Sequence, residues 1–350
     1  MSSISIYIKK SLAAPLRHCV NNYKIFNKYK PHDEYLVVMY HRITIKNESK
    51  YFMQDGMYVD PDTFRMQILH LMDNYNIVPL EKILSIRDTN NKFENNKPCC
   101  IITFDDGWKD FYENAYPILK CFQVYSTVFL PTDYIGTNKL FWTDKLAWIF
   151  KCKECKNDKY DIIGLTSSLG DAIKQIESIH LAHDLKIEKM IQILKKLPTK
   201  EIDDILDELA YKWHVNINTQ GPSFLSWDEV KEMHDSGVVY FGSHTKSHQI
   251  LTTSSDEVIQ KELVQSKNML IENNVVSPSF VPFAYPNGNY TRKIANMVRD
   301  AGYSIAVTTE RGWNRLEGDR NDLYKLKRVG IHQDIASSES MFACRIMGIY

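Results

Sequence analysis

The sequence predicts an α/β fold built around a parallel β-sheet, because short β-branched runs alternate along the chain with longer segments of helical period. The runs are almost continuously apolar, as is typical of parallel strands buried on both faces. We expect eight strands, at residues 35–40, 77–80, 99–104, 125–130, 238–241, 280–284, 303–308 and 326–331. Their spacing is compatible with a parallel barrel or with a doubly wound sheet.

Helix start signals lie between these runs. Asp60 and Pro61 begin a segment whose apolar residues share one helical face. Ser226-x-x-Glu229 has the pattern of a capping box, and a similar pattern begins at Ser254. These signals complete the alternation of strand and helix.

Residues from about 140 to 225 interrupt the alternation. They contain no convincing strand but several amphipathic helical segments, such as 199–210. The β/α pattern resumes afterwards, so we interpret this stretch as a helical insertion between two strands. Residues 31–350 are therefore expected to form one domain that carries the insertion.

The first thirty residues form a basic amphipathic arm. They hold six lysine and arginine residues and no aspartate or glutamate, interleaved with aliphatic and aromatic side chains. Such a segment is suited to peripheral contact with an anionic membrane surface. The alternative is a helix packed on the domain with its charged face in water.

Composition narrows the functional class. The 43 basic residues balance the 43 acidic ones, so no overall field attracts nucleic acid, and we expect no nucleic-acid partner. No apolar run has the roughly 18 to 20 residues that span a bilayer, and no signal-peptide core is evident. The seven cysteines are odd in number and follow no framework spacing, which favours reduced thiols. The expected location is the cytoplasm, peripherally at the inner face of the membrane if the arm binds lipid.

Polar, chemically capable residues directly follow the predicted strands. In parallel barrels the carboxyl ends of the strands form the active-site face, so side chains distant in sequence converge there. The residues in these positions are His41, Asp105, Asp106, His244, Tyr285, Thr309 and His332.

Two pairs of residues after these strands have the composition of a metal site. Asp105 and Asp106 are adjacent carboxylates, so one can bind a metal while the other faces the attacking water; the alternative is an Asx turn or helix cap. His244 and His248 are four residues apart and would share one face of a helix. Paired surface histidines are the alternative. Two histidines and one carboxylate leave an open position on zinc or a related ion, and the ligand types do not separate Zn from Co, Ni or Fe.

Three motifs in fixed order resemble a known family. TFDDG at 103–107, SHTKSH at 243–248 and FAYPNG at 283–288 are similar to the first three motifs of the polysaccharide deacetylases, the NodB-homology or carbohydrate esterase family 4 enzymes. The resemblance extends from about residue 35 to residue 331. It implies a distorted (β/α)7 barrel that removes N- or O-acetyl groups from sugar polymers with one divalent metal, zinc being the expected ion.

The resemblance also implies roles for individual residues. Position by position, Asp105 matches the general base, and Asp106, His244 and His248 match the metal ligands. In the third motif the backbone N–H of Asn287 matches the oxyanion donor, and Tyr285 is expected to contact substrate.

The sequence departs from the familiar members in two places. The arginine that holds their catalytic base is replaced by Ala284, and Arg328 on a later strand is the expected substitute. Their late Leu-x-His motif, which supplies the general acid, has no clear counterpart. Tyr40-His41 instead resembles the exopolysaccharide and surface-glycan subgroup with permuted motif order, which makes His41, and not His332, the expected acid.

The resulting hypothesis is metal-dependent hydrolysis of N-acetyl groups on amino sugars. The expected substrate is an acetylated amino-sugar glycan or its lipid- or nucleotide-linked precursor. Two alternatives remain: an O-acetyl esterase or non-sugar amidase of the same fold, and a catalytically inert glycan-binding relative.

Overall fold

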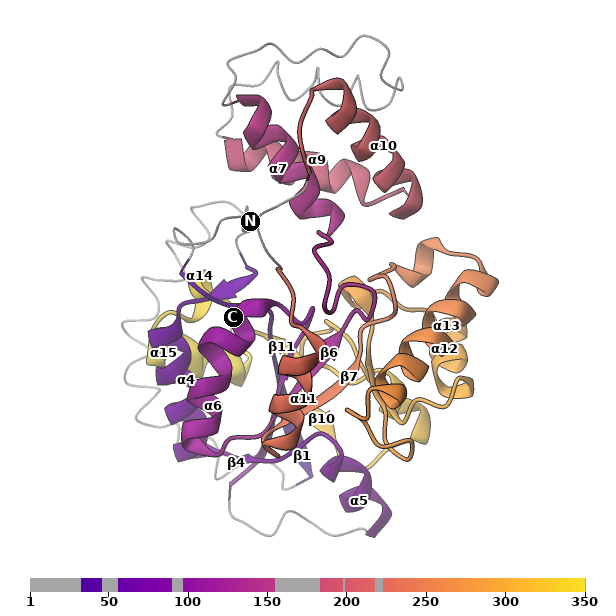
Figure 1. The fold of residues 1–350 in the computed structure, drawn as a ribbon. Coiled ribbons are helices and arrows are strands. Elements are labelled where there is room, and N and C mark those ends of the chain that lie inside the picture. The colour runs from indigo at the N-terminus through magenta and orange to yellow at the C-terminus, as the bar shows by residue number, and fades with distance from the viewer. Residues whose placement is uncertain are drawn as a thin grey trace.

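A curled parallel sheet forms the centre of the computed structural model (Figure 1). Neighbouring strands pair in the order β1, β5, β6, β7, β8 and β9, and each of these pairs is parallel. The bounds are β1 (Glu34–Tyr40), β5 (Cys99–Phe104), β6 (Ser126–Leu130), β7 (Val239–Ser243), β8 (Pro282–Ala284) and β9 (Ile305–Val307). The structure describes residues 33–45, 56–89, 97–154, 183–197, 199–217 and 223–349, so the arm predicted for residues 1–30 lies outside the described residues.

Residues 326–330 close the sheet into a ring. Leu326 forms a parallel bridge with Val307 of β9, and β11 (Val329–Gly330) pairs in parallel with β1, where Val329 faces Val38. Six strands and this closing segment make the distorted (β/α)7 barrel that the resemblance implied. The pairings that close the ring involve few residues, a single bridge to β9 and two pairs to β1, so the barrel is distorted at this point.

The central strands follow the apolar pattern of the sequence. Every residue of β5 and β6 is buried, as expected for parallel strands covered on both faces. The strand predicted at 77–80 is reduced to β4 (Asn76–Ile77), because Pro79 has no N–H to donate to a ladder. Short peripheral strands complete the set: β2 (Arg42–Ile43), β3 (Tyr58–Val59) and β10 (Asn314–Arg315).

Helices surround the barrel (Figure 1). They are α4 (Pro61–Asn74), α5 (Lys82–Thr89), α6 (Tyr116–Phe122), α11 (Trp227–Asp235), α12 (Asp256–Glu272), α13 (Arg292–Asp300), α14 (Gln333–Ala336) and α15 (Glu339–Met347), with a π-helix η2 (Phe111–Ala115) before α6 and 3-10 turns η3 (Leu251–Thr253), η4 (Pro286–Gly288) and η5 (Arg320–Tyr324). Both hydrogen bonds of the predicted capping box form at Ser226 and Glu229. The N-cap of α12 is Ser255, one residue after the predicted start.

The predicted helical insertion stands above the barrel, at the top of Figure 1. It contains α7 (Trp142–Glu154), α9 (His183–Leu194) and α10 (Thr199–Lys212), with no strand among described residues 142–217. Its buried side chains form a hydrophobic cluster of their own, from Leu146 to Trp213. No helix in the described ranges combines the length and the apolar character needed to cross a bilayer.

Candidate active site

The residues that follow the barrel strands line one cavity of about 420 Å³. Its wall includes six of the predicted site residues: His41, Asp105, Asp106, His244, His248 and Asn287. The second face of the cavity comes from the insertion, through residues 142–144 of α7 and residues of α9. A larger cavity of about 900 Å³ lies between insertion and barrel, but none of the predicted site residues is among the described residues that line it. The smaller cavity is therefore the candidate active site.

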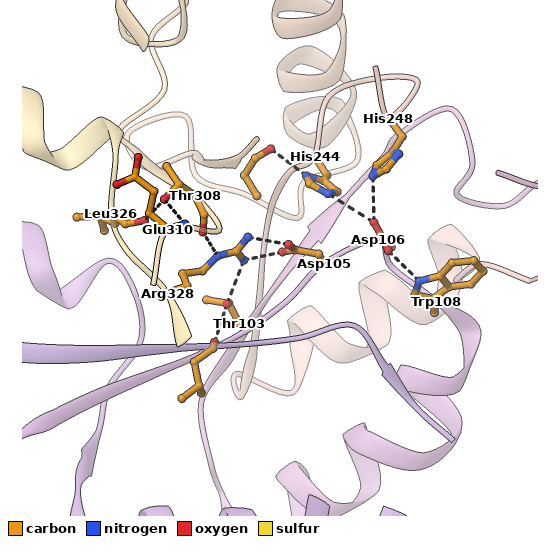
Figure 2. A network of polar contacts seen from close by, with 12 residues as sticks. Thr103, Asp105, Asp106, Trp108, His244, His248, Thr308, Glu310, Leu326 and Arg328 are labelled. Carbon is orange, nitrogen blue, oxygen red and sulfur yellow. Dashed lines mark hydrogen bonds and ion pairs between the residues drawn. The ribbon is translucent and has the colours of Figure 1, made fainter. Parts of the chain in front are cut away.

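Asp106, His244 and His248 bring three potential metal ligands together (Figure 2). One ligand atom from each residue lies within 4.8 Å of the others. The Oδ1 atom of Asp106 is 3.5 Å from Nε2 of His244 and 3.3 Å from Nε2 of His248. Two imidazoles and one carboxylate converging on one point fit a zinc-like ion that keeps an open coordination position.

Neighbouring groups orient two of these three ligands. Nδ1 of His244 donates to the carbonyl of Ala284 at 2.9 Å, which leaves Nε2 directed toward Asp106. The indole N–H of Trp108 donates to Oδ2 of Asp106 at 3.0 Å, which leaves Oδ1 for the two histidines (Figure 2). Such outer contacts fix the ring tautomer and the carboxylate rotamer of metal ligands.

The segment that joins the two histidines is a loop and not the helix that their spacing suggested. Thr245 and His248 have left-handed backbone angles, φ 63° and 56°, which no helix would contain. The loop is held from α12, because the buried carboxylate of Glu262 accepts the backbone N–H groups of Lys246 and Ser247 at 2.9 and 2.8 Å. A tight turn after β7 therefore points both rings at Asp106.

Backbone strain is concentrated around the cavity. Asp106 has φ 77° and Asn287 has φ 56°, in addition to the two left-handed residues of the histidine loop. Non-glycine residues in this region cost free energy and are characteristic of functional sites. The barrel thus holds the ligand loops in conformations that the chain would not adopt alone.

Arg328 clamps the predicted base, Asp105. Its Nη1 and Nη2 atoms donate to the two carboxylate oxygens of Asp105, each at 2.7 Å, and its Nε donates to the carbonyl of Thr308 at 2.7 Å (Figure 2). Arg328 is 0% exposed. A planar guanidinium in this bidentate arrangement fixes the orientation of a carboxylate. The geometry supports the expectation that Arg328 replaces the arginine missing at Ala284.

The charges of the site set its protonation pattern. Burial alone raises the pKa of Asp105, but the positive charges of Arg328 and His244 outweigh it, so the pKa lies below its usual value. For Asp106, hydrogen bonds from His244 and His248 outweigh burial and hold the pKa well below its usual value. Both carboxylates are therefore ionised at neutral pH, as a base and a metal ligand require.

The two candidate acids occupy different places. His41 lines the cavity, where burial lowers its pKa and the negative charges of Asp106 and Asp105 oppose the shift only in part. His332 lies at the start of α14, where its Nδ1 contacts Asp334, and it is not among the described residues that line the cavity. The geometry favours His41.

The third motif contributes its backbone and not its tyrosine. Asn287 lines the cavity, and a Cβ on the following Gly288 would lie 1.9 Å from Oγ1 of Thr309, so only glycine fits this turn. The position of Tyr285 differs from the prediction that its side chain contacts substrate. Its side chain is fully buried and its hydroxyl donates to the carbonyl of Tyr324 at 2.9 Å, so it supports the turn and does not face substrate.

Three residues at or near the cavity escaped the sequence analysis. Arg42 lines the cavity, pairs with buried Asp110 at 2.7 Å and lies 4.5 Å from the Trp108 ring centre. Its position directly after His41 was an available signal. Glu262 and Asp144 carried no signal, because each lies on an amphipathic helix far in sequence from the motifs.

Comparisons with known proteins agree with this geometry. A family model described as polysaccharide deacetylase matches residues 92–167 and 188–306, more than half of the chain. A Bacillus subtilis (strain 168) protein named "Putative polysaccharide deacetylase YxkH" is 22% identical over 303 residues, covering 86% of this chain and 73% of the relative.

Solved structures show the same fold. IcaB from Ammonifex degensii superposes with a TM-score of 0.56 at 17% identity, covering 89% of this chain and 97% of that chain. A de-N-acetylase from Aggregatibacter actinomycetemcomitans superposes with a TM-score of 0.51 at 16% identity, covering 86% and 95%. With the motifs, the closed barrel and the family match in agreement, this chain belongs to the polysaccharide deacetylase family.

Proposed function

We propose that the protein is a metal-dependent deacetylase that hydrolyses N-acetyl groups of amino sugars in a glycan or glycan precursor. The observation that carries the proposal is that one cavity holds both a possible metal site and a separate ionised carboxylate. Asp106, His244 and His248 offer a complete ligand set, and an ionised carboxylate clamped by Arg328 lies beside it. The name of one structural relative, a de-N-acetylase, favours N-acetyl over O-acetyl groups.

Asp106, His244 and His248 would hold the ion. When bound, a divalent metal supplies Lewis acidity toward the acetyl carbonyl and the attacking water. Zinc suits this donor set best, and Co, Ni and Fe accept the same ligands. Buried Trp108 and the carbonyl of Ala284 keep the ligands oriented before the ion arrives.

The remaining steps belong to the protein's own residues. Asp105 accepts a proton from the water that attacks the acetyl carbon, and Arg328 keeps Asp105 ionised and oriented. The backbone N–H of Asn287 is the proposed donor to the developing oxyanion. His41 then delivers a proton to the departing sugar amine, and its lowered pKa makes the protonated ring a stronger acid. The products are acetate and a free amine.

The decisive experiment incubates zinc-loaded protein with acetylated amino-sugar oligosaccharides and with their lipid- or nucleotide-linked precursors. Mass spectrometry should detect loss of acetyl groups in step with acetate release. Asp105→Asn is the matched control, since it should retain metal and lose turnover. Release of acetate only from a chromogenic ester would identify an O-acetyl esterase, and sugar binding without any acetate release would identify an inert relative.

We also propose that residues 1–30 bring the enzyme to the anionic inner face of a membrane, where a lipid-linked precursor would be found. The six basic residues of this arm support the proposal, since each adds about 1 kcal/mol near an anionic surface. Binding to phosphatidylserine vesicles should weaken with salt and disappear when residues 1–30 are removed. Equal binding by the truncated protein would contradict the proposal.

A further inference from the structure

Asp144 is a buried carboxylate in the catalytic cavity that the proposed mechanism does not use. It lies in the first turn of α7, in the helical insertion, and lines the cavity opposite residues from the barrel such as His41 and Asp105. Asp144 is 8% exposed. The insertion therefore contributes an ionisable group to the site.

The carboxylate of Asp144 is weakly partnered. Its side-chain hydrogen bond comes from the adjacent Thr143 hydroxyl, at 3.5 Å, which is at the limit of such a contact. By contrast, Asp110 at the edge of the same region is held by Arg42 at 2.7 Å and by the N–H of Ile43 at 3.0 Å. Burial without strong donors raises the pKa of Asp144 to about 7.

A buried carboxylate without a strong hydrogen-bond donor costs free energy until a donor reaches it. Three aromatic side chains, Trp108, Phe141 and Trp142, line the same cavity beside its polar and charged residues. Aromatic rings together with hydrogen-bonding groups are what a sugar ring requires of a binding site.

We propose that Asp144 is a specificity-determining residue that accepts a hydrogen bond from a ring hydroxyl of the acetamido sugar. The inference rests on the proposed function, and it assigns to the insertion the recognition of the sugar beside the acetyl group. The barrel then supplies the hydrolytic groups, and the insertion selects the hydroxyl pattern that is allowed to approach them.

The test measures binding of the methyl β-glycoside of N-acetylglucosamine and of its 3-, 4- and 6-deoxy analogues. The protein is the full-length zinc-loaded chain carrying Asp105→Asn, so that the ligand is not consumed. Asp144→Ala should weaken binding of the parent sugar about tenfold to a hundredfold, as expected for a hydrogen bond to a charged group. Asp144→Asn should stay within about fivefold, since its amide oxygen still accepts a hydroxyl.

One deoxy analogue should bind the Asp144 protein as weakly as the parent sugar binds the alanine variant, and should lose nothing further in that variant. This pattern identifies the hydroxyl by a double-mutant cycle. The matched control is Asp203→Ala, a carboxylate of the same insertion that lines the larger cavity and should leave binding unchanged. Unchanged affinity in Asp144→Ala, or equal affinity for all analogues, would overturn the inference.

Two further readouts separate this role from others. A purely structural role predicts a lower melting temperature for Asp144→Ala, whereas a group held for ligand binding predicts an equal or higher one. Acetate release by the unmodified protein tests the proposed function separately. Asp144-dependent sugar binding without acetate release would overturn the function alone, and acetate release with KM unchanged in Asp144→Ala would overturn the inference alone.

Discussion

The buried carboxylates on the barrel face and on the insertion face of the catalytic cavity differ in how well they are paired. On the barrel face, Asp105 is matched by the guanidinium of Arg328, and Asp106 is matched by His244 and His248. On the insertion face, the hydrogen bond that Asp144 receives from another side chain is a long one, from Thr143 at 3.5 Å. The first face is organised before any ligand arrives, whereas the second leaves an acceptor for one.

The two faces also rest on different cores. The strands and helices of the barrel bury their side chains in two hydrophobic clusters, while the insertion buries its own in a separate cluster. A substitution inside the insertion can therefore alter recognition with little effect on the barrel. The comparison shows that the proposed hydrolytic groups and the proposed selecting group lie on separately packed units. The following experiments test that division.

The largest effect is expected from the three proposed metal ligands of the barrel face. His244→Ala should remove one of three protein ligands, so bound zinc should fall and turnover should drop by at least about 10³-fold, the scale of losing a Lewis acid. Elemental analysis and acetate release are measured together. His332→Ala, outside the cavity, is the control. Full zinc content and activity in His244→Ala would remove this residue from the ligand set.

The next effect distinguishes the two candidate acids. His41→Ala should retain metal and lose about 10² to 10⁴ in turnover, and the alkaline limb of its pH–rate profile should disappear. His332→Ala should remain within roughly tenfold of the parent, because it lies outside the cavity wall. The reverse ranking would restore the ordinary motif order and reject the permuted one.

Stability should respond to the barrel's buried ion pair. Arg328→Met leaves the carboxylate of Asp105 buried without its partner, which should lower the free energy of unfolding by about 3–5 kcal/mol. Arg315→Met is the matched control, since it breaks the ion pair between the exposed Arg315 and the partly buried Glu34, a pair near the surface worth about 1 kcal/mol or less. Urea unfolding monitored by circular dichroism compares the two. Equal losses would mean that the pair with Asp105 is not stabilising.

The smallest effect concerns Asp144 and pH. Its pKa is raised to about 7 in the folded protein, so the folded state binds more protons than the unfolded state between pH 4 and 7. Stability should therefore fall as pH rises through this window, by at most about 4 kcal/mol. Asp144→Asn should flatten the slope in metal-free protein. An unchanged slope would show that Asp144 is better solvated than its burial implies.

The barrel and the convergence of its polar residues were predictable because both depend on local patterns. Apolar runs placed the strands, and polar residues directly after them reached one cavity, as the closure of a parallel sheet requires. The path from His244 to His248 was not predictable from a spacing of four. A loop with a left-handed Thr245, whose next two N–H groups donate to a carboxylate on α12, achieves the same convergence as a helical turn.

Two residues illustrate what the sequence could not indicate. Tyr285 follows a strand as the site residues do, but its ring packs against Phe283 and Tyr290 and away from the cavity. Asp144 sits in an ordinary amphipathic helix, and it reaches the cavity only because the insertion lies over the barrel mouth. Both outcomes depend on tertiary packing, which no local pattern records.

The closure of the barrel by residues 326–330 has a consequence for how the protein is made. The contact between Asp105 and Arg328 joins positions 223 residues apart, and Val329 must pair with Val38 for the last segment to dock. Contacts of such long range require the closure of a long loop, whose entropic cost slows their formation. A chain emerging from the ribosome would thus complete its three proposed metal ligands well before Arg328 is available to clamp Asp105, so the complete site would assemble only after residue 328 has been made.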